Sequence, residues 1–188
     1  MRIISGSKKG HIIRPPKNLP IRPTTDLSKE SLFNILVNRF DLEDCDVLDL
    51  FSGGGSVSLE FASRGAKTVT SIDKHPGCAG FLKSEAKKLE FDQLEVIRAD
   101  VFHFIRNTGD KFDIIFCDPP YAFSQVQYDE MIRTILDRQL LKEDGWCIVE
   151  HHFVTKLDHF PERFNMRAYG QNILSFFGNQ KAEEPSTD

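Results

Sequence analysis

The stretch Val47–Gly55, VLDLFSGGG, decides the fold that this sequence predicts. It begins as an apolar run of strand length, Val47 to Phe51, and ends in glycines. A helical pattern follows from Ser56 to Arg64 and is closed by Gly65. A buried strand that passes through a glycine-rich turn into a helix is the opening unit of an α/β domain.

The same alternation of strand and helix continues along the chain. Further strands are expected over residues 68–72, 94–99, 112–117 and 146–150. Further helices are expected over residues 76–90, 101–106 and 128–141. Two β-type runs, 163–169 and 172–177, are joined at Gly170-Gln171 and predict a terminal antiparallel hairpin. The pattern therefore predicts an α/β fold with a mainly parallel, seven-stranded sheet and helices on both of its faces.

The first forty residues predict a small extension before this sheet. Short β-type runs at 2–5 and 11–14 flank a glycine- and lysine-rich stretch and indicate a β-hairpin with a flexible basic tip. After an extended, proline-rich connection, a helix is expected over 27–40, with one apolar face buried. That face is made by Leu32, Phe33, Leu36, Val37 and Phe40. We thus expect an extension (1–40), an α/β domain (41–178) and a disordered polar tail (179–188).

Composition limits the classes of protein that this chain can belong to. Its 188 residues are 40% hydrophobic and 28% charged, which suits a globular protein with one sizeable core. Neither a membrane-spanning run nor a signal peptide is visible, so we expect a cytoplasmic location. The four cysteines form no CxxC pair, and the adjacent His151 and His152 alternate faces of a strand. No metal site is therefore expected.

Charge is distributed unevenly along the chain. Residues 1–40 carry eight Lys and Arg against two acidic residues, a balance of +6, which leaves −10 for the remainder of a chain with net charge −4. A basic segment on an acidic body is typical of an arm that binds a polyanion. An ordinary solvated basic face is the alternative.

The loop after the first strand is expected to bind a cofactor. Its motif is Asp-x-Phe-x-Gly-x-Gly and not the GxGxxG of dinucleotide-binding proteins. An acid suits a cationic ligand, and S-adenosylmethionine carries an ammonium and a sulfonium group. Acids also end the second and third strands, where they are expected to meet the ribose and the adenine amine. The predicted cofactor-binding residues are Asp49, Phe51, Ser52, Gly53, Gly55, Asp73, Asp100 and Val101.

The fourth strand ends in Asp118-Pro119-Pro120-Tyr121, which we expect to be catalytic. The Asp118 carboxylate and the Pro119 carbonyl can each accept one hydrogen of a planar amine. The prolines fix the backbone so that both acceptors are already aimed, and the Tyr121 ring can stack on the base. Transfer of a methyl group to such an amine is the predicted chemistry. The alternative is a simple Pro-Pro turn capped by Asp118.

Together, the Asp-Pro-Pro-Tyr motif and the Asp49–Gly55 loop resemble the class I, S-adenosylmethionine-dependent amino-methyltransferases, which have a Rossmann-like fold. More narrowly, Arg22-Pro-Thr-Thr-Asp26, Glu30–Leu36 (ESLFNIL) and Val47–Gly55 resemble the RsmD family. The resemblance covers about residues 1–178. It implies methylation of N2 of one guanine in 16S ribosomal RNA, within the small ribosomal subunit or its assembly intermediate.

The resemblance also implies which residues meet the RNA, and we expect the enzyme to act on it as a monomer. These residues belong to the basic hairpin and to the RPTTD segment: Lys8, Lys9, Arg14, Arg22, Thr24, Thr25 and Asp26. The chain departs from the family's pattern at Ser58, where a glycine is usual, which bears on the packing of helix against sheet.

Two other functions remain open from the residues alone. A DNA adenine-N6 methyltransferase would use the same amine clamp, although this chain has no separate DNA-reading domain. A non-catalytic RNA-binding assembly factor could keep the cofactor fold, although an intact Asp118 and acidic loop speak against it.

Overall fold

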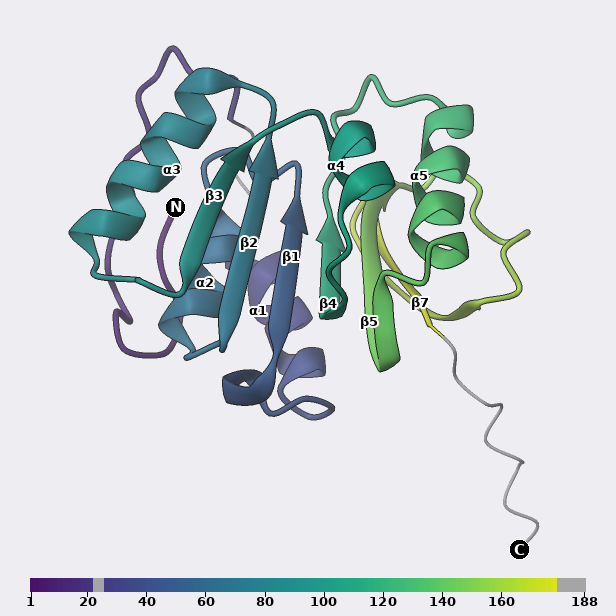
Figure 1. Ribbon diagram of the computed structural model, residues 1–188, viewed down its shortest axis with the longest axis horizontal. Coiled ribbons are helices and arrows are strands. Elements are labelled where there is room, and N and C mark those ends of the chain that lie inside the picture. Colours follow the sequence, from purple (N-terminus) through teal and green to yellow (C-terminus); the bar gives the residue numbers. More distant parts are fainter. Residues whose placement is uncertain (22–25, 179–188) are drawn as a thin grey trace, which may run out of the picture.

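Seven strands form one sheet in the computed structural model of the chain (Figure 1), which describes residues 1–21 and 26–178, without the side chains of residues 26 and 27. The strands are β1 (Asp46–Leu50), β2 (Thr68–Asp73), β3 (Leu94–Arg98), β4 (Phe112–Cys117), β5 (Leu141–His152), β6 (Arg163–Tyr169) and β7 (Asn172–Phe177). Their order is β3-β2-β1-β4-β5-β7-β6. The first five run parallel, and β7 and β6 add antiparallel pairs.

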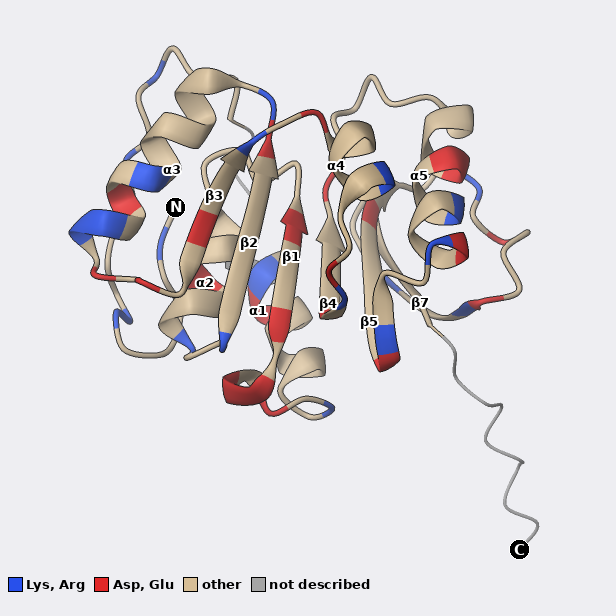
Figure 2. Cartoon of the chain, in the orientation of Figure 1, with Lys and Arg blue, Asp and Glu red and all other residues tan. Residues whose placement is uncertain are grey.

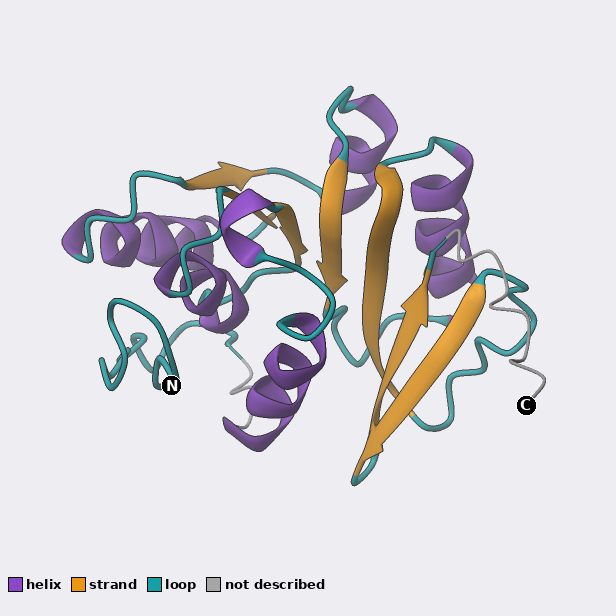
Figure 3. Ribbon diagram, turned by 90° about the horizontal axis from the view of Figure 1, so that it is seen from below, coloured by secondary structure: helices purple, strands orange, loops and turns teal. Residues whose placement is uncertain are grey.

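Helices cover both faces of the sheet (Figure 3). They are α1 (Asp26–Leu36), α2 (Ser56–Ser63), α3 (Pro76–Lys88), α4 (Val101–Asn107) and α5 (Gln125–Asp137), with a short 3₁₀ helix, η1 (Leu42–Asp44). Each face of the sheet has its own hydrophobic core, and neighbouring residues of a central strand pack into opposite cores. In β1, Val47 packs with α1, α2 and α3, whereas Leu48 packs with α4 and α5. Because both faces are covered, β1 and β4 are almost continuously buried.

The predicted architecture is confirmed: all seven expected strands are present, and the terminal hairpin has the expected bounds. The first half of the sheet runs β1, β2, β3 outward, and the chain then crosses to β4 on the other side of β1. The order therefore reverses between β1 and β4. A doubly wound sheet binds its ligands at this switch point, beside the carboxyl ends of the strands.

The expected N-terminal hairpin is present only in reduced form. In place of two strands, the chain makes one isolated antiparallel bridge, between Arg2 and Ile12. The amides of Ile4 and Ser5 donate to the carboxylate of Glu60 in α2, at 2.8 and 3.0 Å, and not to a facing strand. A buried side chain of the sheet domain therefore takes the hydrogen bonds that would have extended the hairpin.

The helix expected over 27–40 ends earlier, at Leu36. The side-chain amide of Asn38 donates to the carbonyl oxygen of Asn34 at 2.7 Å. That oxygen would have accepted the next backbone hydrogen bond of a longer helix. Val37 is consequently 48% exposed, while Phe40 packs edge-on against the Trp146 ring.

The helix expected over 128–141 is shifted toward the N-terminus, and the strand expected over 146–150 is longer. Ser124 and Gln127 form a capping box that starts α5 at Gln125. After α5 ends, the chain turns at Gln139, which has a φ of 54°. Strand β5 then begins at Leu141, which lies opposite Phe112 of β4.

Within the described residues, no helix has the length and apolar character needed to cross a membrane. The predicted tail, 179–188, lies outside the described residues, as do Arg22, Thr24 and Thr25. Asp26, of which only the backbone is described, is the first residue of α1.

Candidate functional site

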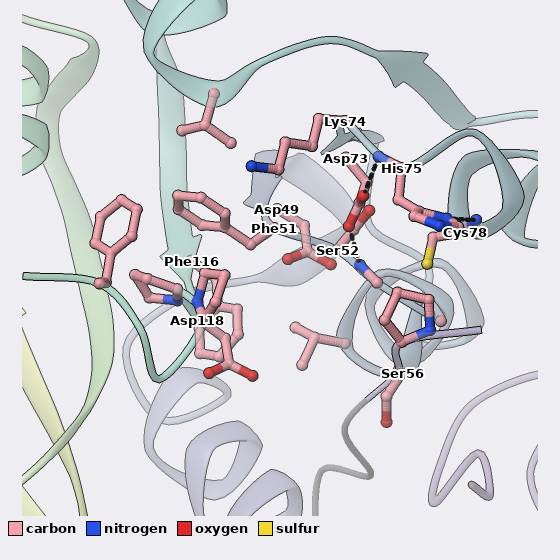
Figure 4. Close-up of a pocket in the computed structure, with 18 of the residues that line it drawn as sticks. Asp49, Phe51, Ser52, Ser56, Asp73, Lys74, His75, Cys78, Phe116 and Asp118 are labelled. Carbon is pink, nitrogen blue, oxygen red and sulfur yellow. Dashed lines mark hydrogen bonds between the residues drawn. The ribbon is translucent and has the colours of Figure 1, made fainter. Parts of the chain in front are cut away.

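A cavity of about 610 Å³ opens at the carboxyl ends of the central strands (Figure 4). Its volume is in the range of small-molecule sites. It brings predicted cofactor and catalytic residues into one place. The predicted residues in its wall are Asp49, Phe51, Ser52, Gly53, Asp73, Asp100, Val101, Asp118, Pro119, Pro120 and Tyr121.

Figure 2 shows acidic segments at the upper ends of β1 and β2 and in the loop from β3 into α4. They belong to Asp49, Asp73 and Asp100, which all line the cavity. Since the strands are parallel and adjacent, their carboxyl ends meet at one edge, as the spacing of the acids predicted. This edge therefore gathers three carboxyl groups around the cavity.

Asp49 is buried beneath the loop. Its carboxylate accepts a hydrogen bond from the Ser58 hydroxyl, and Ser71 in turn donates to Ser58 at 2.7 Å. Burial raises the pKa of Asp49 to about 7, and the Ser58 hydrogen bond opposes that rise. Ser58 itself is fully buried. The hydroxyl at this position thus fits between α2 and the sheet and holds the carboxylate of the cofactor loop.

Asp73 ties the loops after β1 and β2 together. One of its carboxylate oxygens accepts the amide of Gly53 at 2.8 Å, and the other accepts the amide of His75 at 2.7 Å. Asp100 caps α4 by accepting the amide of His103 at 3.1 Å. These backbone bonds orient both carboxylates before any ligand is present.

Gly55, which we predicted to bind the cofactor, does not line the cavity. It has a φ of +77°, and a Cβ there would lie 2.1 Å from Cδ1 of Leu82 in α3. The glycine is therefore required for the turn and for the close approach of α3. Gly54, by contrast, lines the cavity.

The Asp-Pro-Pro-Tyr segment faces the cofactor loops across the cavity. In Figure 4, Asp118 lies on the opposite side of the cavity from Asp73 and His75. The amide of Asp118 continues the ladder by donating to the carbonyl oxygen of Leu50 at 3.4 Å. The amide of Phe123 donates to Pro120 at 2.9 Å and closes the turn. Tyr121 is 67% exposed at the rim.

Several cavity residues were missed by the sequence reasoning. Lys74 and His75 directly follow Asp73, so their adjacency to a strand-end acid was the signal available. Phe102 and Phe123 also line the cavity, and their rings stack with centroids 5.8 Å apart. Phe123 also meets Phe51 edge-on, so this aromatic contact joins the loops after β1, β3 and β4.

The cavity also receives part of the N-terminal extension. Met1 and Pro20 line it, and no local signal in the sequence indicated this. The basic tip lies elsewhere: the amide of Ser7 donates to Ser63, the last residue of α2, at 2.7 Å. The first residue of α2, Ser56, lines the cavity, so the tip is separated from it by the length of the helix, on the order of 12 Å.

Three of the predicted RNA-contacting residues have described side chains, and they differ in exposure. Lys9 and Arg14 are exposed, whereas Lys8 is half-buried, with its amine 3.9 Å from Glu90 of the loop after α3. The structure does not bring the two tip lysines to the cavity.

A buried ion pair anchors this extension, and no local feature of the sequence indicated it. Lys29 of α1 is 1% exposed, and its amine lies 3.2 Å from Glu60 of α2. The same amine donates to the carbonyl oxygen of Arg2 at 2.6 Å. Arg64 also donates to Glu60, at 2.8 Å. One buried carboxylate therefore joins α1, α2 and the start of the chain.

Some polar groups in the cavity wall lack a hydrogen-bond partner, and their chemistry shows whether S-adenosylmethionine fits this site. Within the described chain, the buried hydroxyls of Ser52 and Ser56 have no hydrogen-bond partner. Both are donors beside the N-terminus of α2, where a carboxylate is favoured. Asp49 is an acceptor suited to an ammonium group. A zwitterionic amino-acid end fits this donor and acceptor set.

The two histidines at the end of β5 contact other groups of the protein. His151 is buried, and its ring contacts the Ser175 hydroxyl at 2.8 Å and the His152 carbonyl at 3.0 Å. Among residues 1–21 and 26–178, no group of three or more possible metal ligands gathers.

Comparisons with known proteins agree with this geometry. Residues 1–178 match the family described as "Conserved hypothetical protein 95". Ribosomal RNA small subunit methyltransferase D of Buchnera aphidicola (Acyrthosiphon pisum) is 34% identical over 150 residues, which cover 79% of this chain and 76% of that protein. The Escherichia coli K12 protein of the same name is 29% identical over 191 residues, covering 100% of this chain and 94% of that protein.

Solved structures show the same fold. The Escherichia coli protein yhhF has a TM-score of 0.84 and 26% identity, covering 96% of this chain and 99% of that one. A hypothetical protein of Thermus thermophilus has a TM-score of 0.81 and 25% identity, covering 95% and 99%. Because the family match spans the extension, the acidic loop and the Asp-Pro-Pro-Tyr segment, the chain belongs to the "Conserved hypothetical protein 95" family, which is the RsmD family that its motifs resemble.

Proposed function

We propose that this enzyme transfers a methyl group from S-adenosylmethionine to the exocyclic N2 amine of one guanine in 16S ribosomal RNA. The observation that carries the proposal is the position of Asp118-Pro119-Pro120-Tyr121, which shares one cavity with the acidic loops of a cofactor site. Membership of the RsmD family supports ribosomal RNA as the substrate, since its curated relatives are named ribosomal RNA small subunit methyltransferase D.

The proposed cofactor-binding residues surround the half of the cavity built by β1, β2 and β3. Asp49 and the hydroxyls of Ser52 and Ser56 would hold the amino-acid end. Asp73 would accept from the ribose, and Asp100 would lie near the adenine amine. When bound, S-adenosylmethionine supplies an electrophilic methyl group on its sulfonium.

The proposed clamp acts by positioning the amine. An exocyclic amine is a poor nucleophile because its lone pair is delocalised into the ring. The Asp118 carboxylate and the Pro119 carbonyl would accept the two amine hydrogens, so that the lone pair points at the methyl carbon. Two successive prolines restrict the backbone, so the two acceptors need little rearrangement when the amine binds. Tyr121, at the exposed rim, would stack on the base.

We further propose that the extension, residues 1–40, contacts the RNA around the cavity. Met1 and Pro20 already line the cavity, and the chain from Pro20 leads into the RPTTD segment before α1. Lys9 and Arg14 would meet phosphates at a distance from the base. We also propose that the enzyme acts as a monomer in the cytoplasm, on the small subunit or its assembly intermediate.

Labelled methyl transfer tests this function. The enzyme is incubated with labelled S-adenosylmethionine and either 30S particles, naked 16S RNA or duplex DNA, and the modified nucleoside is then identified. We expect N2-methylguanosine in the RNA. N6-methyladenine in DNA would instead support the adenine methyltransferase, and cofactor binding without transfer to any substrate would support a non-catalytic assembly factor.

A further inference from the structure

Four exposed apolar side chains stand beside the amine clamp. Tyr121 and Val126, in the segment after β4, are 67% and 73% exposed. Phe153 and Val154, after β5, are 50% and 62% exposed. We call these four residues the loop rim. Exposed apolar side chains that are grouped together are typical of surfaces that meet a partner.

The two segments of the loop rim are held together by a reciprocal pair of hydrogen bonds. The side-chain amide of Gln125 donates to the carbonyl oxygen of Lys156 at 2.7 Å, and its oxygen accepts the amide of Lys156 at 3.0 Å. Because Gln125 precedes Val126 and Lys156 lies two residues after Val154, these bonds join both pairs of apolar side chains.

The loop rim adjoins the cavity through one of its residues. Tyr121 both lines the cavity and belongs to the rim. Strand β4 ends at Cys117, opposite Val149, whereas β5 continues to His152. Phe153 follows there, with its amide bonded to Gln171 at 3.0 Å and its ring 4.4 Å from that of His152. An aromatic pair thus stands at the end of β5, past the residue that lies opposite the end of β4.

The charges around the loop rim tolerate a polyanion. Two acids of this region have partners: Asp158 lies 3.0 Å from Arg163, and Asp129 lies 3.2 Å from the His159 ring. Lys156 is exposed, and its amine pairs with no carboxylate in the described part of the chain. Lys156 therefore places a cation beside the loop rim, where it could pair with a phosphate of the RNA.

We infer that the loop rim binds unpaired nucleotides next to the target base by stacking, with Phe153 as the main platform. The inference rests on the proposed function. A base that enters the cavity must leave its stack, which also exposes the faces of its neighbours. Proteins that bind single-stranded RNA use exposed aromatic rings for such bases. The basic tip, at the far end of α2, cannot supply this contact.

Binding of Phe153→Ala to naked 16S RNA and to 30S particles tests the inference, with salt concentration varied. Loss of one base–aromatic stack weakens binding by about tenfold, and we expect this for both substrates. Stacking releases no counterions, so the slope of log K against log salt should stay that of the wild type. Phe153→Tyr should restore the affinity, and Met166→Ala, an exposed apolar residue on β6, is the matched control.

The outcomes separate the possible partners. Wild-type affinity of Phe153→Ala for both substrates overturns the inference, as does a loss confined to 30S particles, which would indicate a protein contact. Charge reversal at Lys9 and Arg14 should instead reduce the salt slope. S-adenosylmethionine affinity of Phe153→Ala, measured alongside, should equal that of the wild type. Failure of the wild type to methylate any RNA would refute the proposed function itself, independently of these affinities.

Discussion

The two halves of the cavity differ in where the chain places them. On the cofactor side, three carboxylates follow the ends of β1, β2 and β3 or lie within them, and each accepts hydrogen bonds from the protein. On the acceptor side, Asp118 to Tyr121 lie beyond the end of β4, and Tyr121 is two-thirds exposed. One side is built into the sheet, and the other stands in a loop.

The difference fits what each side is proposed to bind. A small cofactor gains from acceptors and donors that are already oriented, because little conformational entropy is then lost on binding. A base that is part of a large RNA must enter from outside, so its site has to stay open. Changes on the cofactor side should therefore affect stability and cofactor affinity, and changes on the acceptor side should affect turnover.

The largest effect is expected for Asp118→Ala. Without its carboxylate the clamp loses one of two acceptors for the amine, and turnover should fall on the order of 10²-fold or more. S-adenosylmethionine affinity and melting temperature should be retained. Single-turnover methyl transfer and calorimetric titration measure the two properties. Asp144→Ala, outside the cavity, is the control, and comparable turnover of both variants would show that the clamp is not catalytic.

A smaller effect, on stability, is expected for Gly55→Ala. The new methyl group would meet Leu82 in a region of positive φ, which should cost roughly 1–3 kcal/mol of unfolding free energy. Gly53→Ala is the matched control, because its φ is also positive (+51°) but a Cβ there would meet only the Phe51 carbonyl oxygen, 3.9 Å away. Urea denaturation compares the two. Equal losses would mean that backbone strain alone, and not the packing of α3, explains the glycine.

The smallest effect is a pH dependence that arises from Asp49. Burial raises its pKa to about 7, above the value in the unfolded chain, so the folded state retains a proton that the unfolded state has lost. This stabilising contribution is present at low pH and is lost as pH rises through about 7. A cationic ligand favours the ionised carboxylate, so S-adenosylmethionine affinity should rise about tenfold between about pH 5.5 and 7.

Calorimetric titration in buffers of different ionisation enthalpy detects the proton released on binding. Asp49→Asn should bind more weakly and show a flat profile over this range. A wild-type profile that is equally flat would mean that Asp49 does not face the cationic end of the ligand.

Much of the site could be predicted because its signals are local. Asp49, Asp73 and Asp100 each stand at the end of a strand, and parallel strands place their carboxyl ends at one edge. The same reasoning could also have predicted that residues directly after those acids line the cavity. The exact ends of the helices were harder to predict from the sequence, because Asn38 and the Ser124–Gln127 capping box set them through individual side-chain hydrogen bonds.

The sequence by itself determined the alternation of strands and helices and the edge at which the acids meet, and it predicted the chemistry of the clamp. Only the tertiary structure decided that Gly55 packs on Leu82, that Lys29 is buried against Glu60, and that the basic tip lies away from the cavity. The physical reason is distance along the chain. Periodicity and turn residues report on neighbours in sequence, whereas these contacts join residues that become neighbours only when helices pack on the sheet.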